Sequence, residues 1–574
     1  MPVLPTSGVP FDKARLTRRG FMAAGIAGGF ALAACGGSKP QASDSAAKMA
    51  AAIAATEATR PHSGRTVTAT VTAQQTEIDL GGVTARTFAY GNTIPGPTIR
   101  ARVGDELAVT VANRLDHPTS LHWHGIALRN DMDGAEPATP NIAAGQDFTY
   151  RFSVPNVGTY WGHPHTGLDA DMGLYLPVII DDPTEAGNYD AEWIVVLDDW
   201  TDGVGKSPQQ LYDELTDPNK RSMPSMPPTT TSSGTTSTTT TTTTTKPTST
   251  TTPSSTPSGT SRTSGTSGTS GTSGTSGSSG TSSTTSSASE MPGMPGTSGN
   301  GVGKSDLLGG DAGDIAYPYY LINGRIPAAP TTFKAQPGQR IRIRFISTAS
   351  DTAFRVALGG HSMTVTHTDG YPVVPTKVDA LLIGMAERYD VIVTAGDGVF
   401  PLVAAAEGKN ALARALLSTG SGSPPDAGFL PAELGKRVGV VEMFTATTPV
   451  NLGRAEPNLN LSVVLGGTMA KYDWTINGEP YSKTNPLHIR QGQRPTITFD
   501  NTTMMWHPMH LHGHTFQLIK ADGSLGARKD TVIVLPKQKV SAVLVADNPG
   551  LWQLHCHNTY HQDAGMQTRL DYLF

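Results

Sequence analysis

The sequence is poor in cysteine and has no excess of basic residues. Only two of its 574 residues are cysteine, Cys35 and Cys556, so a framework of several disulfides is excluded. The net charge of -5 at pH 7 argues against a nucleic-acid partner, because proteins that bind nucleic acids usually present a strongly basic domain. The function therefore has to be sought in particular residues rather than in overall charge.

The N-terminus has the features of an export signal. Arg18-Arg19 precede an apolar run of small residues, as in twin-arginine signals. This run is too short to span a membrane comfortably, which takes about 20 apolar residues. It ends in LAAC (32–35), which resembles a bacterial lipobox. We expect residues 1–35 to be a lipoprotein signal and Cys35 to anchor the protein by lipid to the outer face of the cell membrane. A plain signal peptide with an incidental cysteine is the alternative.

The second cysteine lies between two histidines, in the segment LHCHNTYHQDAGM (554–566). If Cys35 carries lipid, Cys556 has no disulfide partner. An exported protein needs a reason to keep such a lone thiol. Metal ligation is the most direct one.

Two segments lack the composition of a folded domain. Residues 36–65 are rich in Ala, Ser and Thr and are predicted to be a tether. Residues 228–290 are almost entirely Thr, Ser, Gly and Pro, with too little apolar area to offset their ordering entropy, which predicts disorder. With its flanks this insert runs from about 205 to 305. The remaining residues, about 440, correspond to about three domains at the usual size of about 150.

The rest of the chain alternates apolar and polar residues over short runs. Examples are residues 105–113, 147–154, 339–347, 388–395 and 541–547. Period-two alternation with Gly, Pro and Asn between the runs indicates antiparallel strands. The fold class is therefore all-β, built from sandwiches or barrels.

One pattern recurs three times. A Pro-led extended stretch is followed by a glycine turn, at Gly104, Gly338 and Gly492, and then by an alternating strand. The repeat predicts three similar β domains in tandem. We place them at residues 66–185, 186–450 (with the insert) and 455–574.

Histidines fall into register with this repeat. His122 and His124 lie 18 and 20 residues after Gly104, and a second pair lies the same distances after Gly492. The middle repeat has no histidine in the corresponding segment, FRVALGG. The four His-x-His pairs of the chain are His122/His124, His163/His165, His510/His512 and His555/His557.

The pairs indicate a cluster of several copper ions. In a strand, residues i and i+2 face the same side, so each pair offers two imidazoles in one direction. Eight imidazoles are too many for one zinc, which takes four ligands, and imidazole is a good ligand for copper. Cys556 points away from its two neighbours and can bind a different copper, together with two histidines and a weak axial methionine. One strand would then connect two metal sites.

At this point the sequence resembles the multicopper oxidases, a family that includes laccases, ascorbate oxidase and bacterial cuprous oxidases. The motifs that carry the resemblance are HWHG, HPH, HPMHLHGH and HCHNTYHQDAGM, in the family's order. The resemblance covers the chain except the leader and the insert. It is strongest to the actinobacterial copper-tolerance oxidases, which are exported and lipid-anchored. It implies three cupredoxin domains and four coppers per chain.

The resemblance also implies a ligand for each copper. The type 1 ligands would be His507, Cys556, His561 and Met566. The type 2 ligands would be His122 and His510. One type 3 copper would take His124, His163 and His557, and the other would take His165, His512 and His555. His514 matches no ligand and is expected to be structural.

The implied reaction is the oxidation of a substrate in four one-electron steps, through Cys556 and its two histidine neighbours, with reduction of O2 to two waters. Asp133 matches an acid that the family keeps near the cluster, and we expect it to relay protons; a plain turn residue is the alternative. Gln562 stands where bacterial relatives often have a second acid. Asp563 could substitute for it.

Cu(I), Fe(II), Mn(II) and phenols are all possible reductants, and we expect Cu(I) oxidation in copper tolerance, by a monomer. A copper-sequestering protein without turnover is the rival hypothesis. It draws on methionines that flank the insert and could collect Cu(I), because thioethers favour that ion. They are Met223, Met226, Met291 and Met294. The complete set of cluster histidines argues against storage as the main role.

Overall fold

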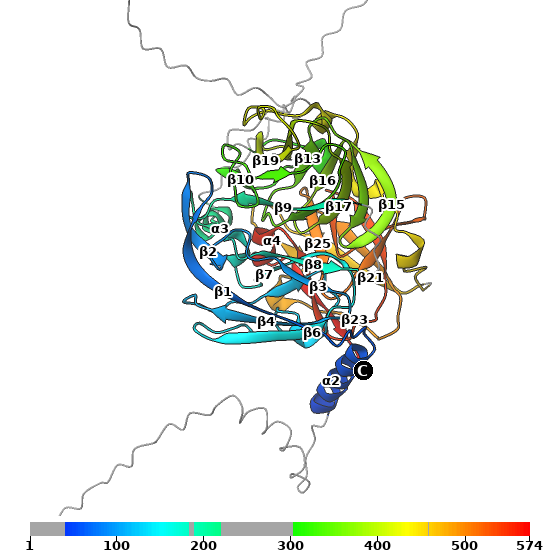
Figure 1. The fold of residues 1–574 in the computed structure, drawn as a ribbon. Helices are drawn as coiled ribbons and strands as arrows, with labels where there is room; N and C mark the ends of the chain where they lie inside the picture. Colours follow the sequence, from blue (N-terminus) through cyan, green and yellow to red (C-terminus); the bar gives the residue numbers. More distant parts are fainter. Residues whose placement is uncertain (1–40, 183–188, 218, 220–301, 457) are drawn as a thin grey trace, which may run out of the picture.

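A computed structural model describes residues 41–182, 189–217, 219, 302–456 and 458–574. It consists of three β-sandwiches in chain order, each made of two sheets (Figure 1). This confirms the predicted all-β class. Within the described residues, none of the helices has the length and apolarity required to cross a bilayer.

The first sandwich pairs two four-stranded sheets, in the orders β2-β1-β4-β6 and β3-β8-β7-β5. β5 and β7 are antiparallel and set His122 opposite His163. The strands are β1 (Thr66–Asp79), β2 (Thr84–Tyr90), β3 (Ile99–Arg102), β4 (Glu106–Asn113), β5 (His122–His124), β6 (Asp147–Ser153), β7 (Gly158–His163) and β8 (Leu176–Asp181).

The second sandwich pairs two six-stranded sheets, in the orders β10-β9-β12-β17-β14-β15 and β11-β19-β18-β13-β16-β20. The strands are β9 (Ala191–Trp200), β10 (Tyr319–Ile322), β11 (Thr332–Lys334), β12 (Arg340–Ser347), β13 (Phe354–Leu358), β14 (Met363–Thr368), β15 (Tyr371–Val378), β16 (Ala380–Ile383), β17 (Arg388–Thr394), β18 (Val399–Ala406), β19 (Ala411–Ser418) and β20 (Val438–Gly439).

The third sandwich pairs sheets of six and five strands, in the orders β22-β21-β24-β29-β26-β27 and β23-β31-β30-β25-β28. β25 and β30 are antiparallel and set His510 opposite His555, which repeats the arrangement of the first sandwich. The strands are β21 (Asn460–Gly466), β22 (Thr475–Ile476), β23 (Leu487–Ile489), β24 (Thr496–Asn501), β25 (His507–Leu511), β26 (Phe516–Ile519), β27 (Leu525–Lys529), β28 (Thr531–Val534), β29 (Lys539–Leu544), β30 (Leu551–Cys556) and β31 (Gln567–Tyr572).

The helices lie outside the sheets. Within the described residues the α-helices are α2 (Gln41–Ala58), which is the longest with 18 residues, α3 (Pro208–Thr216) and α4 (Thr559–Asp563). The 3-10 turns are η2 (Asn130–Met132), η3 (Asp169–Asp171), η4 (Asp306–Leu308), η5 (Ala432–Gly435), η6 (Val441–Met443), η7 (Thr448–Val450) and η8 (Tyr481–Lys483).

The segment predicted to be a tether (36–65) contains α2, and this part of the prediction was wrong. Its alanines have the highest helix propensity of any residue, and its second half has a surface to pack against. Met49 packs against the apolar core and Ile53 is buried. In Figure 1 the N-terminal end of α2 projects from the body, and the C-terminus lies beside the part of the helix nearer the body.

The predicted limits of the insert, near 205 and 305, were too wide. A capping box at Ser207 starts α3, and Leu211 and Leu215 of this helix pack against the core. On the other side Val302 is already buried. Residues 228–290, which were predicted to be disordered, lie outside the described residues.

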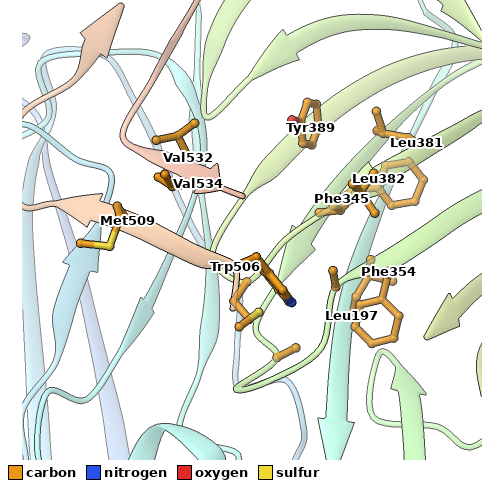
Figure 2. Close-up of a cluster of buried hydrophobic side chains, with 14 of the residues drawn as sticks. Leu197, Phe345, Phe354, Leu381, Leu382, Tyr389, Trp506, Met509, Val532 and Val534 are labelled. Atoms are coloured by element: carbon orange, nitrogen blue, oxygen red, sulfur yellow. The ribbon is translucent and has the colours of Figure 1, made fainter. Parts of the chain in front are cut away.

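The second and third sandwiches share one apolar core. Trp506 and Met509 of the third belong to the same buried cluster as Phe345 and Phe354 of the second (Figure 2). Leu197, from the first strand of the second sandwich, lies with them. A continuous core fixes the two sandwiches relative to each other, so side chains from both can form one site.

Candidate metal centre

Two side-chain clusters capable of holding metal lie near the ends of β25 and β30. The smaller one contains His507, Cys556 and His561, all buried. The Sγ of Cys556 is 3.7 Å from Nδ1 of each histidine, and the two Nδ1 atoms are 3.1 Å apart. Two imidazoles and a thiolate in a trigonal arrangement are the ligands of an electron-transfer copper.

Neighbouring residues hold both imidazoles of this cluster with Nδ1 toward the sulfur. The Nε2 of His507 hydrogen-bonds to Thr503 Oγ1 at 2.9 Å. The Nε2 of His561 hydrogen-bonds to Asp314 Oδ2 at 3.1 Å. Second partners of this kind fix ring orientation in metal sites. Asp314 was not identified from the sequence.

Met566 is buried and is brought back to Cys556 by the chain itself. The N–H of Met566 donates to the carbonyl of His561, and the N–H of Cys556 donates to the carbonyl of Met566. Burial would lower the pKa of His561, but the Asp314 carboxylate and the Cys556 thiol raise it to about 10. In the metal-free chain this imidazole therefore holds a proton that a metal must displace.

The larger cluster joins the first and third sandwiches. His122 stacks on His512, and His124 stacks on His510, with ring centroids 3.7 Å apart in both pairs. All four His-x-His pairs reach this cluster, as their ring contacts show. The groups whose nitrogens could share a metal include His122/His124/His163, His122/His510/His512 and His165/His512/His555.

Most of these imidazoles use one nitrogen for the protein and leave the other free for a metal. The Nδ1 atoms of His122, His163 and His510 each donate to a backbone carbonyl at 2.9 Å. Their Nε2 atoms are buried without a partner, as is Nε2 of His557. His124 is turned the other way: its Nε2 contacts Asp530 Oδ1 at 3.1 Å and its Nδ1 is unpartnered. Buried imidazole nitrogens without a hydrogen-bond partner are suited to bind copper.

The contact between His512 and His555 shows most clearly that the larger cluster fits a metal ion. His512 donates its Nδ1 proton to Asp133 and His555 donates its own to the Cys556 carbonyl, both at 2.9 Å. Burial lowers the pKa of both rings well below the usual value, so both are neutral. Their Nε2 atoms then carry lone pairs, yet they lie 3.0 Å apart. A metal ion held by both nitrogens would remove this repulsion.

The two clusters meet at Cys556. Its side chain belongs to the smaller cluster, whereas its carbonyl oxygen accepts the proton of His555 Nδ1, a ring of the larger one. His557, the other neighbour, also lies in the larger cluster, where its ring centroid is 5.1 Å from that of His163. The predicted connection of two metal sites by one strand thus has a short covalent and hydrogen-bonded path.

Two buried carboxylates support the larger cluster. Asp133, expected from the sequence, places Oδ2 on His512 and Oδ1 3.3 Å from His122 Nδ1; Oδ1 has no hydrogen-bond partner. Asp530 was not identified from the sequence. It follows β27 by one residue and carries no histidine motif, so only the pairing of β25 with β28 brings it to His510.

The prediction that Asp563 could substitute for a second acid, at the position where Gln562 stands, was wrong. Asp563 is exposed and contacts Tyr212 of α3. Gln562 is the residue at the cluster, with Nε2 3.4 Å from His165 Nδ1. His514 hydrogen-bonds to the His512 carbonyl and the Tyr572 hydroxyl, in keeping with a structural role. Cys35 and the four methionines that flank the insert lie outside the described residues.

Three family models for multicopper oxidases match this chain, over residues 70–185, 290–422 and 454–572. Multicopper oxidase MmcO of Mycobacterium tuberculosis is 67% identical over 573 residues, which cover 100% of both chains. A copper resistance protein A homolog of Pseudomonas syringae pv. tomato is 28% identical, over 86% of this chain and 90% of the relative.

Solved structures with the same fold include Fet3p, described as a multicopper oxidase that functions in iron import. It has a TM-score of 0.65 and 18% identity, over 88% of this chain and 90% of the other. The laccase from Botrytis aclada has a TM-score of 0.64 and 22% identity, over 90% and 89%. With its three matched domains and its copper-fitting clusters, the chain belongs to the multicopper oxidase family, whose members carry type 1, type 2 and type 3 coppers.

Proposed function

We propose that this protein oxidises Cu(I) in the cell envelope and so protects the cell from copper, with Fe(II) and phenols as further reductants. The observation that carries the proposal is the Asp314 carboxylate on the outward nitrogen of His561. Relatives named for copper resistance support the same role. Export through the Arg18-Arg19 signal and a lipid on Cys35 are part of the proposal.

Asp314 favours a cationic reductant because of its charge and its free oxygen. Its side chain is only 1% exposed, and Oδ1 is buried without a partner. Asp311 lies near it: burial, and then the charge of Asp314, raise the pKa of Asp311 to about 7. A cation bound here would satisfy both acids, whereas a neutral phenol would not. An electron from it has one hydrogen bond to cross to reach His561.

The metal ligands follow the assignment implied by the family resemblance. His507, Cys556, His561 and Met566 would hold the type 1 copper; His122 and His510 the type 2 copper; His124, His163 and His557 one type 3 copper; and His165, His512 and His555 the other. When bound, copper supplies the one-electron chemistry that converts 4 Cu(I), O2 and 4 H+ into 4 Cu(II) and two waters.

The residues around the cluster would hold ligands and move protons. The unpartnered Oδ1 of Asp133, buried beside His122, is suited to accept a proton and pass it to the cluster. Gln562 cannot release a proton at neutral pH, so its amide only orients His165. We therefore assign proton relay to Asp133.

Both described ends of the insert border the site of electron donation. Tyr212 of α3 contacts Asp563 of α4, the helix that carries His561. On the other side, the residues after 302 lead to Asp314 within 12 positions. This placement supports Cu(I) collection by Met223, Met226, Met291 and Met294, which lie near these ends in the sequence.

Oxygen uptake with Cu(I), Fe(II) and a neutral phenol tests the proposal. Asp314→Asn should raise KM for both cations by about tenfold, because one charge contact is lost, and leave KM for the phenol nearly unchanged. Asp306→Asn, on the same flank but exposed and without a bond to His561, is the matched control. An equal effect on all three reductants would argue for a phenol-oxidising laccase. No oxygen uptake by the copper-loaded protein would favour sequestration.

A further inference from the structure

Asp351 is a fully buried carboxylate of the middle sandwich, the one that supplies none of the cluster histidines. It lies in the loop between β12 and β13. Lys409 donates to its Oδ2 at 2.7 Å. Burial would lower the pKa of Lys409, but the charge of Asp351 raises it above the usual value, so the ammonium stays charged. The two oxygens of this carboxylate also accept hydrogen bonds from two other groups of donors, and both groups lead to His561.

The first set of donors holds Asp314. The backbone N–H groups of Asp314 and Ile315 donate to Asp351 Oδ2, each at 3.0 Å. Asp314 in turn places its own carboxylate on the ring of His561. Asp351 therefore fixes the main chain from which this second carboxylate extends.

The second donor holds the loop of the type 1 ligands. The Nδ2 of Asn558 donates to Asp351 Oδ1 at 2.8 Å. The side-chain oxygen of Asn558 then accepts the N–H groups of Tyr560 and His561, both at 3.1 Å, and so caps α4. From one carboxylate, one path of hydrogen bonds thus reaches the His561 ring and the other reaches its backbone.

We propose that Asp351 is a positioning residue, through which the middle domain fixes His561 relative to both Cys556 and Asp314. Without it the α4 cap and the Asp314 loop would move independently, and the distance between the Asp314 carboxylate and the imidazole would vary. The geometry of the type 1 site then depends on a residue that touches neither copper nor reductant. Only the expected effect on Cu(I) rests on the function proposed above.

The test compares Asp351→Ala and the milder Asp351→Asn with the wild-type holoenzyme. We expect an altered electron paramagnetic resonance signal and a shifted potential of type 1 copper, with type 2 copper unchanged. KM for Cu(I) should rise about fivefold. In the metal-free protein, the peptide containing His561 should exchange its amide hydrogens faster, because its cap is loosened.

Asp390→Asn is the matched control. Asp390 is also a buried acid of the middle sandwich, but its side-chain partners, Thr159, Arg342 and Arg344, do not lead to His561. It should lower stability without changing the type 1 signal, its potential or exchange at His561. Folded Asp351 variants with a wild-type signal, potential and exchange would overturn the positioning role. If the type 1 signal and potential change but KM rises equally for Cu(I) and phenol, the positioning role of Asp351 stands. That result would instead contradict the proposal that Cu(I) is the reductant.

Discussion

Replacing Asp530 by asparagine separates what this residue contributes to copper binding from what it contributes to folding. Its side chain contacts His124 Nε2 at 3.1 Å and forms a fully buried ion pair with Arg388. His510, in contrast, is held mainly by the backbone carbonyl of Asp530, which the substitution retains. Burial would raise the pKa of Asp530, but Arg388 and the imidazoles lower it well below the usual value, so the wild-type group is a carboxylate.

The folding contribution is the larger of the two. Removing one partner of a buried ion pair costs about 3–5 kcal/mol, because the other charge is left buried. Loss of a residue that orients a metal ligand reduces metal affinity by about 10–100-fold, or about 1.4–2.7 kcal/mol. The single variant therefore loses mostly stability, and its copper content alone would be ambiguous.

A double variant, Asp530→Asn with Arg388→Met, resolves this ambiguity. It removes both charges, and Asp369 keeps Lys529 as its ion-pair partner. We expect the denaturation midpoint of the metal-free double variant to return most of the way to wild type, because replacing a whole buried pair is often neutral. The loss of type 3 copper should persist in both variants, whereas type 2 copper should stay bound.

Copper content by atomic absorption, together with the type 2 resonance signal, provides the measurement. If copper returns to wild-type levels along with stability, Asp530 acts through the fold alone. If type 2 copper is lost instead of type 3, the assignment of His124 is wrong.

Three further predictions concern the smaller cluster and the methionines that flank the insert. Cys556→Ser should abolish the blue absorption and turnover with every reductant while the larger cluster keeps its copper, since thiolate-to-copper charge transfer needs sulfur; a blue, active variant would refute the ligand set. Copper should bind the metal-free type 1 site more tightly as pH rises toward about 10 and should release protons, because it must displace the proton of His561, whose pKa is raised to about 10. The affinity should rise about tenfold per pH unit. Copper loading that is independent of pH between 6 and 9, read with a pH indicator, would contradict this. Replacing the four methionines that flank the insert by leucine should lower the efficiency with Cu(I) several-fold and leave phenol oxidation unchanged. Oxygen-uptake curves identical to those of the wild type would show that these methionines are only linker residues. They are Met223, Met226, Met291 and Met294.

The histidine clusters could be predicted from the sequence because their geometry is local. A strand sends residues two apart to the same face, and Cys556 between His555 and His557 therefore faces another site. The repeat then predicted which strands correspond, and the structure pairs β5 with β7 as it pairs β25 with β30.

The supporting acids could not be predicted, because their contacts join distant parts of the chain. Asp314 is 247 residues from His561, Asp351 is 207 from Asn558, and Asp530 is 406 from His124. No spacing rule connects such residues; strand register and domain packing do. The α2 helix was missed for a related reason, since composition alone did not show that its last turns have a surface to cover.

The unpartnered ring nitrogens of the larger cluster also bear on how long the protein survives in its compartment. In the described part of the chain five of them, on His122, His124, His163, His510 and His557, are buried without a hydrogen bond. A buried polar group left without a partner costs about 1–3 kcal/mol, so the metal-free cluster lowers the stability of the folded chain. Copper removes this cost and acts as a folding ligand. Molecules that have acquired copper should resist proteases longer than those that have not, and the amount of active enzyme should rise with the dose of the metal even at constant synthesis.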